Sequence, residues 1–385
     1  MIKLPYLLRT AVLLLLMVIS VSLLKAGEPI TISKDFTLFT TQNLKGYTQP
    51  LVTSIEQSIN SNMYTSASYE ERYYFGLDLS VMGMFIPNSQ KTFNAERPDK
   101  FGDVSVVRTA EIRDGIVLLN YTKDNYQPTI YGGKSTPIFA VPQNSFEPDS
   151  FYKTATFVEG NNISFMAGLP TLQLIAGFPT RTELRLRFLA LPVQDEMLWY
   201  WGAIVNQQFD HWFKIFPEEY KMALALNGAY HSMSRNPGLS ISSWAAGVHW
   251  SKLWDFEKSG QITGYFGFQL ENLTGTFEAV KDTSGMSTDI IDSPYLEVRE
   301  PVNYAKQQGW YDDQGKPQPK LAFDLENQNK FRLVLGFSYK YSFLELHGDF
   351  AYANQPMLTA GITFWLGGFG GKQKLEPGET IEKID

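Results

Sequence analysis

The chain has 385 residues, with 33 Lys and Arg against 40 Asp and Glu, a formal net charge of -7 and no cysteine. The missing thiol excludes disulfide scaffolds, iron–sulfur proteins, cysteine-based zinc sites and cysteine nucleophiles. The acidic balance argues against nucleic acid as a partner. Aromatic residues make up 14% and charged residues only 19%, which is far too aromatic for a disordered chain. This composition is typical of a large β protein, either soluble or embedded in an outer membrane.

The N-terminus predicts export. Residues 1–26 combine a positive start at Lys3 and Arg9 with an apolar run over 11–24 and small residues at Ala26 and Gly27. The apolar run has the length of a signal-peptide core and is short for a membrane-spanning helix. A single N-terminal anchor helix is the alternative. No second apolar run approaches a helical span, so a mature chain that enters a membrane must do so as a barrel.

Residues 27–70 form the next predicted unit. Within it, residues 41–60 are expected to be a helix, because Leu44, Leu51, Ile55 and Ile59 recur near helical spacing. Pro50 is unfavourable inside such a helix. Such a helix at the start of a barrel would lie inside it as a plug or at its periplasmic rim. The sequence leaves both placements open.

From residue 71 to 367 the pattern has a period of two. About ten segments of roughly ten residues or more alternate apolar residues with polar or small ones, as strands with one apolar face do. The clearest segment is near the C-terminus, where one face carries Leu358, Ala360, Ile362 and Phe364, and the other Thr359, Gly361 and Thr363. A soluble sandwich would share this alternation. Strand length favours an all-β transmembrane antiparallel barrel of about 10 strands, and up to 14 if residues 104–121 and their neighbours contribute.

The predicted connections sort into two sets. Those around Thr180, 210–219, 255–260 and Ser342 are short, whereas 87–168 and 281–316 are long. Outer-membrane barrels have short periplasmic turns and longer external loops, so the long segments are expected outside the cell. Aromatic residues near strand ends, such as Trp254, Tyr341 and Trp365, are candidates for the interfacial girdles. Residues 368–385 are expected to form a solvated tail.

The search for catalytic chemistry is negative. The four histidines are scattered without the spacing of a metal site, although His231, His249 and His347 would share a barrel interior. No GxSxG sequence or glycine-rich phosphate loop is present. Ser243 and His249 lie on one strand, too far apart to act as a nucleophile and its base. We therefore expect no enzymatic activity, no metal and no cofactor.

Ionisable residues on the polar strand faces are the most informative set. Opposite charges on neighbouring strands can pair and stabilise a closed interior; for example, Lys340 and Arg332 lie beside a strand with Glu345 and Asp349. The same side chains could line a solute path. The residues predicted to face the interior are Asp78, Arg185, Arg187, Lys221, His231, His249, Gln269, Glu271, Lys330, Arg332, Glu345, His347 and Asp349.

Several short motifs carry a resemblance to a known family. They are GYTQPL at 46–51, NSNMYTSA at 60–67, FGLDLS at 75–80, FIP at 85–87 and AGFPTRTEL at 176–184. They resemble a poorly characterised family of outer-membrane barrels from Bacteroidota, over residues 40–367. The last motif is similar to that family's G-x-P-x-G-T-E-L, with Arg181 where glycine is usual. The family is distantly similar to the long-chain fatty-acid transporter barrels, which carry an N-terminal plug, and this implies uptake of a hydrophobic small molecule.

Together these observations predict a porin-like protein of the bacterial outer membrane. The expected function is passive transport of a small solute, hydrophobic if the resemblance extends to function. The alternative is a non-transporting barrel that anchors loops 87–168 and 281–316 for external partners. Outer-membrane lipid and a small molecule are the expected partners, nucleic acid is not, and the oligomeric state stays open.

Overall fold

The computed structural model describes the chain between residues 41 and 369, with internal gaps. The predicted signal peptide, the loop 281–316 and nearly all of the tail 368–385 lie outside the described residues. The gaps are 96–99, 102–103, 106–108, 114–115, 121–125, 135–136, 142–152, 157–158, 194–195, 236–237, 257–258 and 281–319.

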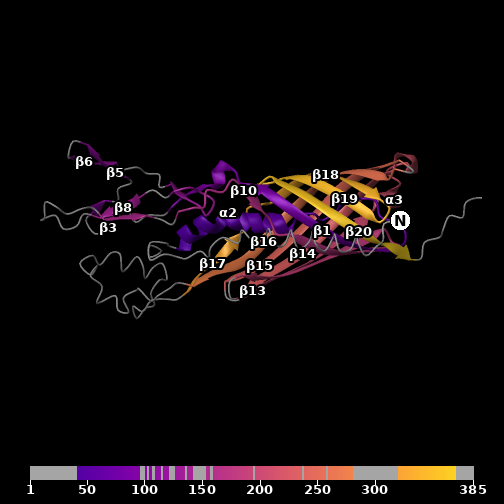
Figure 1. Cartoon of the computed structure of the whole chain (residues 1–385), viewed down its shortest axis with the longest axis horizontal. Helices are drawn as coiled ribbons and strands as arrows, with labels where there is room; N and C mark the ends of the chain where they lie inside the picture. The colour runs from indigo at the N-terminus through magenta and orange to yellow at the C-terminus, as the bar shows by residue number, and fades with distance from the viewer. Residues whose placement is uncertain are drawn as a thin grey trace, which may run out of the picture.

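Ten antiparallel strands form a closed barrel (Figure 1). Each strand pairs with the next along the chain, and β1 pairs with β20 over most of its length, which closes the sheet. The prediction of an antiparallel barrel of about ten strands is confirmed. The strands are β1 (Tyr73–Phe85), β11 (Thr171–Phe178), β12 (Thr182–Val193), β13 (Glu196–Gln208), β14 (Met222–Arg235), β15 (Leu239–Asp255), β16 (Gln261–Val280), β18 (Phe331–Tyr341), β19 (Leu344–Tyr352) and β20 (Met357–Phe369).

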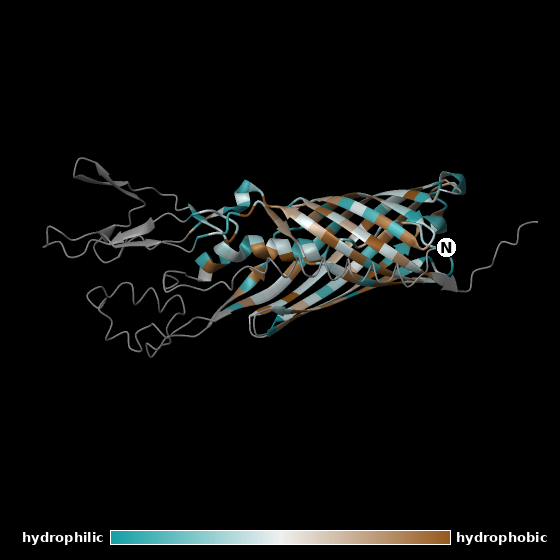
Figure 2. Ribbon diagram, viewed as in Figure 1, coloured by the Kyte–Doolittle hydropathy of each residue, from teal (hydrophilic) through white to brown (hydrophobic). Residues whose placement is uncertain are grey.

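The two faces of the barrel wall differ in polarity. On β18, Leu335 and Phe337 are 63% and 62% exposed on the outside, whereas Arg332 and Ser338 are buried on the inside. The other strands follow the same period of two, and Figure 2 shows the resulting alternation of hydropathy along the strands. The outside of the barrel is therefore apolar and rich in aromatic rings, and its inside is largely polar.

Two further strands extend the sheet at one end. β10 (Phe165–Ala167) pairs with the end of β1, and β17 (Lys320–Glu326) pairs with the end of β16. The strands described in and around residues 104–121 do not join the barrel sheet, so the strand count lies at the lower end of the predicted range of 10 to 14. They contribute to separate pairs, because each segment is too short to span the wall. These pairs are β2 (Thr92–Asn94) with β7 (Tyr126–Pro128), β3 (Lys100–Phe101) with β4 (Val104–Ser105), β5 (Thr109–Arg113) with β6 (Ile116–Asn120), and β8 (Pro137–Val141) with β9 (Lys153–Thr156).

The two ends of the barrel are built differently. At one end, here the α3 end, the connections are short: 179–181, 209–221, 256–260 and 342–343. The second of these contains α3 (Asp210–Phe213) and the 3-10 turn η3 (Glu218–Tyr220). The small strand pairs lie at the opposite end (Figure 1), here called the α2 end.

The predicted helix is present as α2 (Thr41–Ile59), and it continues through Pro50. It enters the barrel at the α2 end (Figure 1). Most of its residues from Asn43 to Ile59 are buried or half-buried. Among the described residues, no helix combines the length and hydropathy needed to cross a membrane.

Candidate functional site

The barrel interior is filled by the N-terminal part of the chain, which we call the plug. The plug consists of α2 and residues 60–72, which continue from the helix through the interior to the start of β1 at the α3 end. The helix ends in the polar run Asn60, Ser61 and Asn62, whose side chains compete for backbone hydrogen bonds. Asn62 adopts a left-handed conformation, with φ +48°, which asparagine tolerates at a helix end.

Part of the barrel interior around α2 is apolar, and the helix also buries polar residues such as Ser54, Glu56 and Gln57. Wall residues and helix residues form one buried hydrophobic cluster, which we call the apolar chamber. The helix contributes Leu44, Tyr47, Val52 and Ile59, and the partly buried Leu51 and Ile55. The wall contributes Tyr200, Met233, Ile241, Leu273, Phe323 and Leu325. The helix is therefore held here by burial of apolar surface, which is favourable but not directional.

Beside the chamber the pairing of the wall is interrupted. The register between β11 and β12 ends at Gln173 with Arg187. In the described part of the chain, residues 188–193 have a strand partner only in β13. Gly168, between β10 and β11, instead approaches the plug, because a Cβ atom there would lie 2.7 Å from the Ser58 Oγ.

Towards the α3 end the contacts become polar, beginning with Arg187. This buried guanidinium donates to the carbonyl oxygens of Ile59 and Asn62, both at 2.7 Å, and to that of Ser61. Its Nε donates to the Gln173 amide oxygen at 2.9 Å. Arg187 thereby satisfies the last carbonyl of α2, that of Ile59, which has no helical partner, and two carbonyls of the segment that follows the helix.

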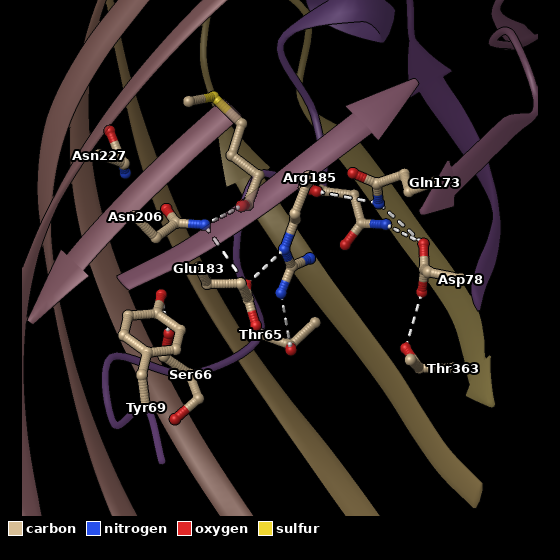
Figure 3. A network of polar contacts seen from close by, with 12 residues as sticks. Thr65, Ser66, Tyr69, Asp78, Gln173, Glu183, Arg185, Asn206, Asn227 and Thr363 are labelled. Atoms are coloured by element: carbon tan, nitrogen blue, oxygen red, sulfur yellow. Dashed lines mark hydrogen bonds and ion pairs between the residues drawn. The ribbon is translucent and has the colours of Figure 1, made fainter. Parts of the chain in front are cut away.

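A second anchor is Asp78 on β1. Its carboxylate accepts from the Asn62 and Gln173 amides, both at 2.8 Å, and from the Thr363 hydroxyl at 2.9 Å. The remaining partner is His347 Nε2, at 2.6 Å from Asp78 Oδ2. Figure 3 shows Asp78 between Gln173 and Thr363. One carboxylate thus ties the plug to β1, β11, β19 and β20.

Arg185 and Glu183 form a third anchor, closer to the α3 end of the barrel. Their side chains are buried and paired, with Arg185 Nε 2.7 Å from Glu183 Oε1. Arg185 also donates to the Thr65 hydroxyl of the plug at 3.3 Å (Figure 3). The Asn206 amide donates to the Met63 carbonyl at 3.1 Å. Neighbouring plug residues therefore contact more than one wall strand, since Met63 contacts β13 and Thr65 contacts β12.

Aromatic and hydroxyl groups hold the last part of the plug. The Tyr64 ring stacks on His249 with ring centroids 3.9 Å apart, and the Tyr69 hydroxyl lies 3.0 Å from His249 Nε2. Tyr64 fits closely because Gly267 has no side chain; a Cβ atom there would lie 1.9 Å from the Tyr64 hydroxyl. The Oγ atoms of Ser66 and Ser251 are 3.4 Å apart. The plug is thus fitted to the wall along its whole length.

At the α3 end the plug borders an open cavity of about 600 Å³. Its lining includes hydroxyl groups such as Ser68 and Ser338, the charged Lys340 and Glu345, and Trp365. The Trp365 indole donates to Glu345 at 2.9 Å, and Lys340 lies 4.7 Å from the centre of its ring. The assignment of Trp365 to an outer girdle is therefore wrong. A shift in register between β1 and β20, next to Trp365, accompanies its inward position.

Most residues predicted to face the interior do so, but two do not. Lys221 is exposed at the end of η3, with φ +47° and its amine 3.5 Å from Asp255, because β14 begins only at the following residue. Lys330 is exposed one residue before β18 begins. Both assignments extended the alternation beyond the strand. The interior residues are Asp78, Arg185, Arg187, His231, His249, Gln269, Glu271, Arg332, Glu345, His347 and Asp349.

The predicted pairing of Arg332 and Lys340 with the charges of β19 is also wrong. Arg332 pairs with Glu271 on the other neighbouring strand, at 2.8 Å, and Lys340 lies 3.8 Å from Glu70 of the plug. Pairing depends on which way each long side chain turns, and alternation does not specify that.

The three interior histidines do not come together. His231 lies 3.1 Å from the Tyr200 hydroxyl, His249 contacts Tyr64 and Tyr69, and His347 contacts Asp78. Among the described residues there is no group of three or more His, Cys, Asp or Glu that could hold a metal ion.

Sequence reasoning missed the plug residues that contact the wall, above all Asn60, Asn62, Tyr64 and Thr65. A signal was present, because residues 60–66 are a mostly polar run with helix-breaking asparagines directly after an amphipathic helix.

The structure also shows the conformation of Arg181, the position where the related motif usually has glycine. It adopts φ +57°, the left-handed region that favours glycine, and it lies in a turn where the related motif carries glycine.

Comparisons with known proteins give a family but no activity. No curated protein matches the chain. Among solved structures it is similar to TbuX, a toluene transporter of Ralstonia pickettii, with 10% identity over 84% of this chain and 99% of that one and a TM-score of 0.25. OprD of Pseudomonas aeruginosa has 11% identity over 81% and 99%, with a TM-score of 0.14. A porin of Rh. blastica has 7% identity over 76% and 99%, with a TM-score of 0.13.

These TM-scores are too low to carry an argument about function. The family comparison covers nearly the whole barrel, including all five motifs that carry the resemblance described above. The chain belongs to DUF6588, a family of unknown function whose model matches residues 3–366.

Proposed function

We propose that the chain is an integral outer-membrane barrel that lets a small, largely apolar solute cross the membrane when its plug moves. The apolar outer face supports a lipid environment, with exposed residues such as Leu335 and Phe337 on β18. The wall strands are 8 to 20 residues long, and a tilted strand of about ten residues crosses the hydrocarbon layer. In this proposal residues 1–26 are the export signal.

The connections suggest the orientation. The short connections of the α3 end correspond to periplasmic turns, and the α2 end, with residues 86–164 and 281–319 between its strands, faces outward. A solute from outside would then meet the apolar chamber first. The cavity of about 600 Å³ at the α3 end would be the exit to the periplasm.

The single observation that carries this proposal is the apolar chamber beneath α2. A barrel that served only as an anchor would need no more than a filled interior, and wall side chains can fill a narrow barrel. Here a separate helix covers apolar wall residues such as Met233, Ile241 and Leu273. Withdrawal of α2 would open an apolar binding surface, which would favour an apolar solute. The interrupted pairing beside β12 would give that solute a side route into the lipid.

A reversible lock tests the proposal, because the chain has no native cysteine. Ser66 lies on the plug and Ser251 on β15, with their Oγ atoms 3.4 Å apart, close enough for a pair of cysteines to be bridged. The double variant Ser66→Cys, Ser251→Cys would be expressed in a Gram-negative host. Uptake of the apolar dye N-phenyl-1-naphthylamine would be followed by fluorescence, with either single variant as the matched control.

We expect faster dye uptake in cells with the reduced double variant than in cells without the protein. Oxidation should return uptake to the background rate, and reduction should restore it. The single variants should not respond to oxidation. Uptake at background rate in the reduced form would contradict transport. Uptake unaffected by a formed disulfide would contradict movement of residues 60–72 and would leave withdrawal of α2 alone as the route, since Ser66 lies beyond the end of that helix.

One observation favours the alternative of an anchor that presents external loops. The strand pairs β3–β4, β5–β6 and β8–β9 lie beyond the barrel rim (Figure 1). The same lock discriminates the two functions, since partner binding by these loops would be indifferent to a plug fixed in the barrel. Deletion of residues 100–120 should then abolish binding of a partner and leave dye uptake unchanged.

A further inference from the structure

Glu56 is an unusual residue on the plug helix. It lies on α2, is fully buried, and has the carboxyl group of Glu271 on β16 and the guanidinium of Arg332 on β18 as its charged neighbours. The backbone N–H groups of Gln328 and Asn329 also face it. Among the described residues, none forms a well-aligned hydrogen bond with either oxygen of the Glu56 carboxyl.

The charges around Glu56 do not balance. Two carboxyl groups, Glu56 and Glu271, share one guanidinium. Arg332 pairs with Glu271, with Nε 2.8 Å from Oε1, and donates to the Gln57 carbonyl at 3.0 Å. Its Nη1 has no hydrogen-bond partner among the described residues, so it does not bond to Glu56 either. The Asn329 amide also donates to Glu271 rather than to Glu56.

A buried carboxylate without its own cation is costly, and such a group binds a proton instead. Burial, reinforced by the nearby Glu271, raises the pKa of Glu56 to about 8. Once α2 leaves the barrel, the same side chain returns to water and to its ordinary pKa near 4.5. The two positions of the helix therefore differ in their affinity for one proton.

We propose that Glu56 is the proton-binding site of the seated plug, so that withdrawal of α2 from the barrel releases this proton. The inference rests on the proposed function only in requiring that the plug can move. The sign follows from linkage. The free energy that favours the seated plug over the released plug is greatest below pH 4.5. It falls as the pH rises from 4.5 towards 8 and is constant above that. Across this window the ratio of released to seated plug should rise about tenfold per pH unit, the limit for one proton.

Thiol labelling measures plug release without any solute. Ser58 on α2 is buried, so Ser58→Cys in the folded barrel should react with a maleimide only when the helix withdraws. Rates would be measured from pH 5 to 9 with Glu56 intact and with Glu56→Gln, a neutral side chain of the same shape. The ratio of the two rates removes the pH dependence of the thiol itself. Gel migration before and after boiling would confirm that each variant forms a barrel.

We expect the ratio to rise by up to tenfold per unit between pH 5 and 8 and then to level. As a control, Glu326→Gln removes an exposed carboxylate that pairs with Lys45 of the same helix, and it should keep the parent's response. Glu271→Gln should move the response to lower pH, because it frees Arg332 for Glu56. A flat ratio, or a Glu56→Gln variant with the parent's response, would overturn the inference.

The two proposals can fail separately. If the pH dependence of Ser58→Cys labelling requires Glu56 but dye uptake stays at the background rate, the proton site is supported and the transport function is wrong. If oxidation of the Cys pair introduced at Ser66 and Ser251 blocks dye uptake but Glu56→Gln leaves the pH dependence of labelling unchanged, transport is supported and the proton site is wrong.

Discussion

The two halves of the barrel interior hold the plug by different balances of apolar packing and polar contact. Polar contacts are present in both, since α2 also bonds to Gln355 through Ser54 and to Arg332 through the Gln57 carbonyl. In the half nearest the α2 end, helix residues such as Val52 and Ile59 pack against wall residues such as Met233 and Ile241 in one apolar cluster. In the half nearest the α3 end, the plug has lost its helix, and wall groups such as Arg187 and Asp78 bind its backbone and its amides individually.

The difference matters for what each half can do. Apolar packing is not directional, so another apolar group of similar volume can take the place of a helix face at modest cost. Buried hydrogen bonds require one geometry, and a group that loses its partner carries the whole cost of desolvation. The apolar half is suited to exchange of occupants, and the polar half to holding one chain segment in one register.

The largest expected effect is at Arg187, in the polar half. Arg187→Met keeps much of the side-chain length but leaves the carbonyls of Ile59, Ser61 and Asn62 without this donor. Each lost bond to a charged donor is worth about 1.5–3 kcal/mol, so the free energy of unfolding should fall by at least about 3 kcal/mol. Urea unfolding of the reconstituted barrel, followed by tryptophan fluorescence, measures it.

Arg187→Lys serves as the control for charge. It keeps the positive charge but lacks the planar fork that reaches several acceptors, so its loss should lie between those of the parent and Arg187→Met. Equal stability of all three proteins would remove the contrast between the two halves.

A smaller effect is expected at Ile59, where the plug passes from the apolar half to the polar one. Ile59→Val removes one buried methylene group from the chamber and should cost about 0.5–1.5 kcal/mol. The backbone carbonyl of residue 59 remains, so its bond with Arg187 should persist. The same unfolding assay measures the cost. A loss of unfolding free energy as large as that of Arg187→Met would show that the chamber tolerates changes no better than the polar half.

The smallest effect is expected at Arg181, outside both halves. Arg181→Gly relieves a left-handed conformation, φ +57°, that costs an ordinary residue about 1–2 kcal/mol. It also loses an exposed pair with Glu71, which is worth about 0–1 kcal/mol. The greater freedom of glycine in the unfolded chain costs about 0.5–1 kcal/mol more, so the net gain in unfolding free energy should be under about 1 kcal/mol. Arg181→Ala keeps the strain and loses the pair, so it should be less stable than the parent; the reverse order would be inconsistent with strain at this turn.

The wall of the barrel was predictable because its signal is local. Alternation along each strand, as in residues 331–339, reports which side chains face in and which face out. Strand ends carried no such signal. Lys221 and Lys330 continue the alternation in sequence, but each lies one residue outside its strand, where the backbone no longer imposes a period of two.

The contacts of the site were much less predictable. The partner of Arg332 is Glu271 on β16, not Glu345 or Asp349 on β19, and both choices satisfy the same alternation. Glu56 had no signal of its own on the helix, because its isolation depends on two wall strands and residues 328–329 that lie more than 200 positions away.

The antiparallel barrel wall, its approximate strand count, the N-terminal helix and the polarity of the two faces were all predictable from residue order alone. These follow from periodicity and from the requirement that every backbone group in a barrel wall finds a partner. Three features became visible only in the folded chain: the helix packs in an apolar chamber, residues 60–69 are bound along the polar interior, and Glu56 faces a carboxyl group without a cation of its own. Those outcomes depend on which residues meet across the barrel, and a local pattern contains no information about distant partners.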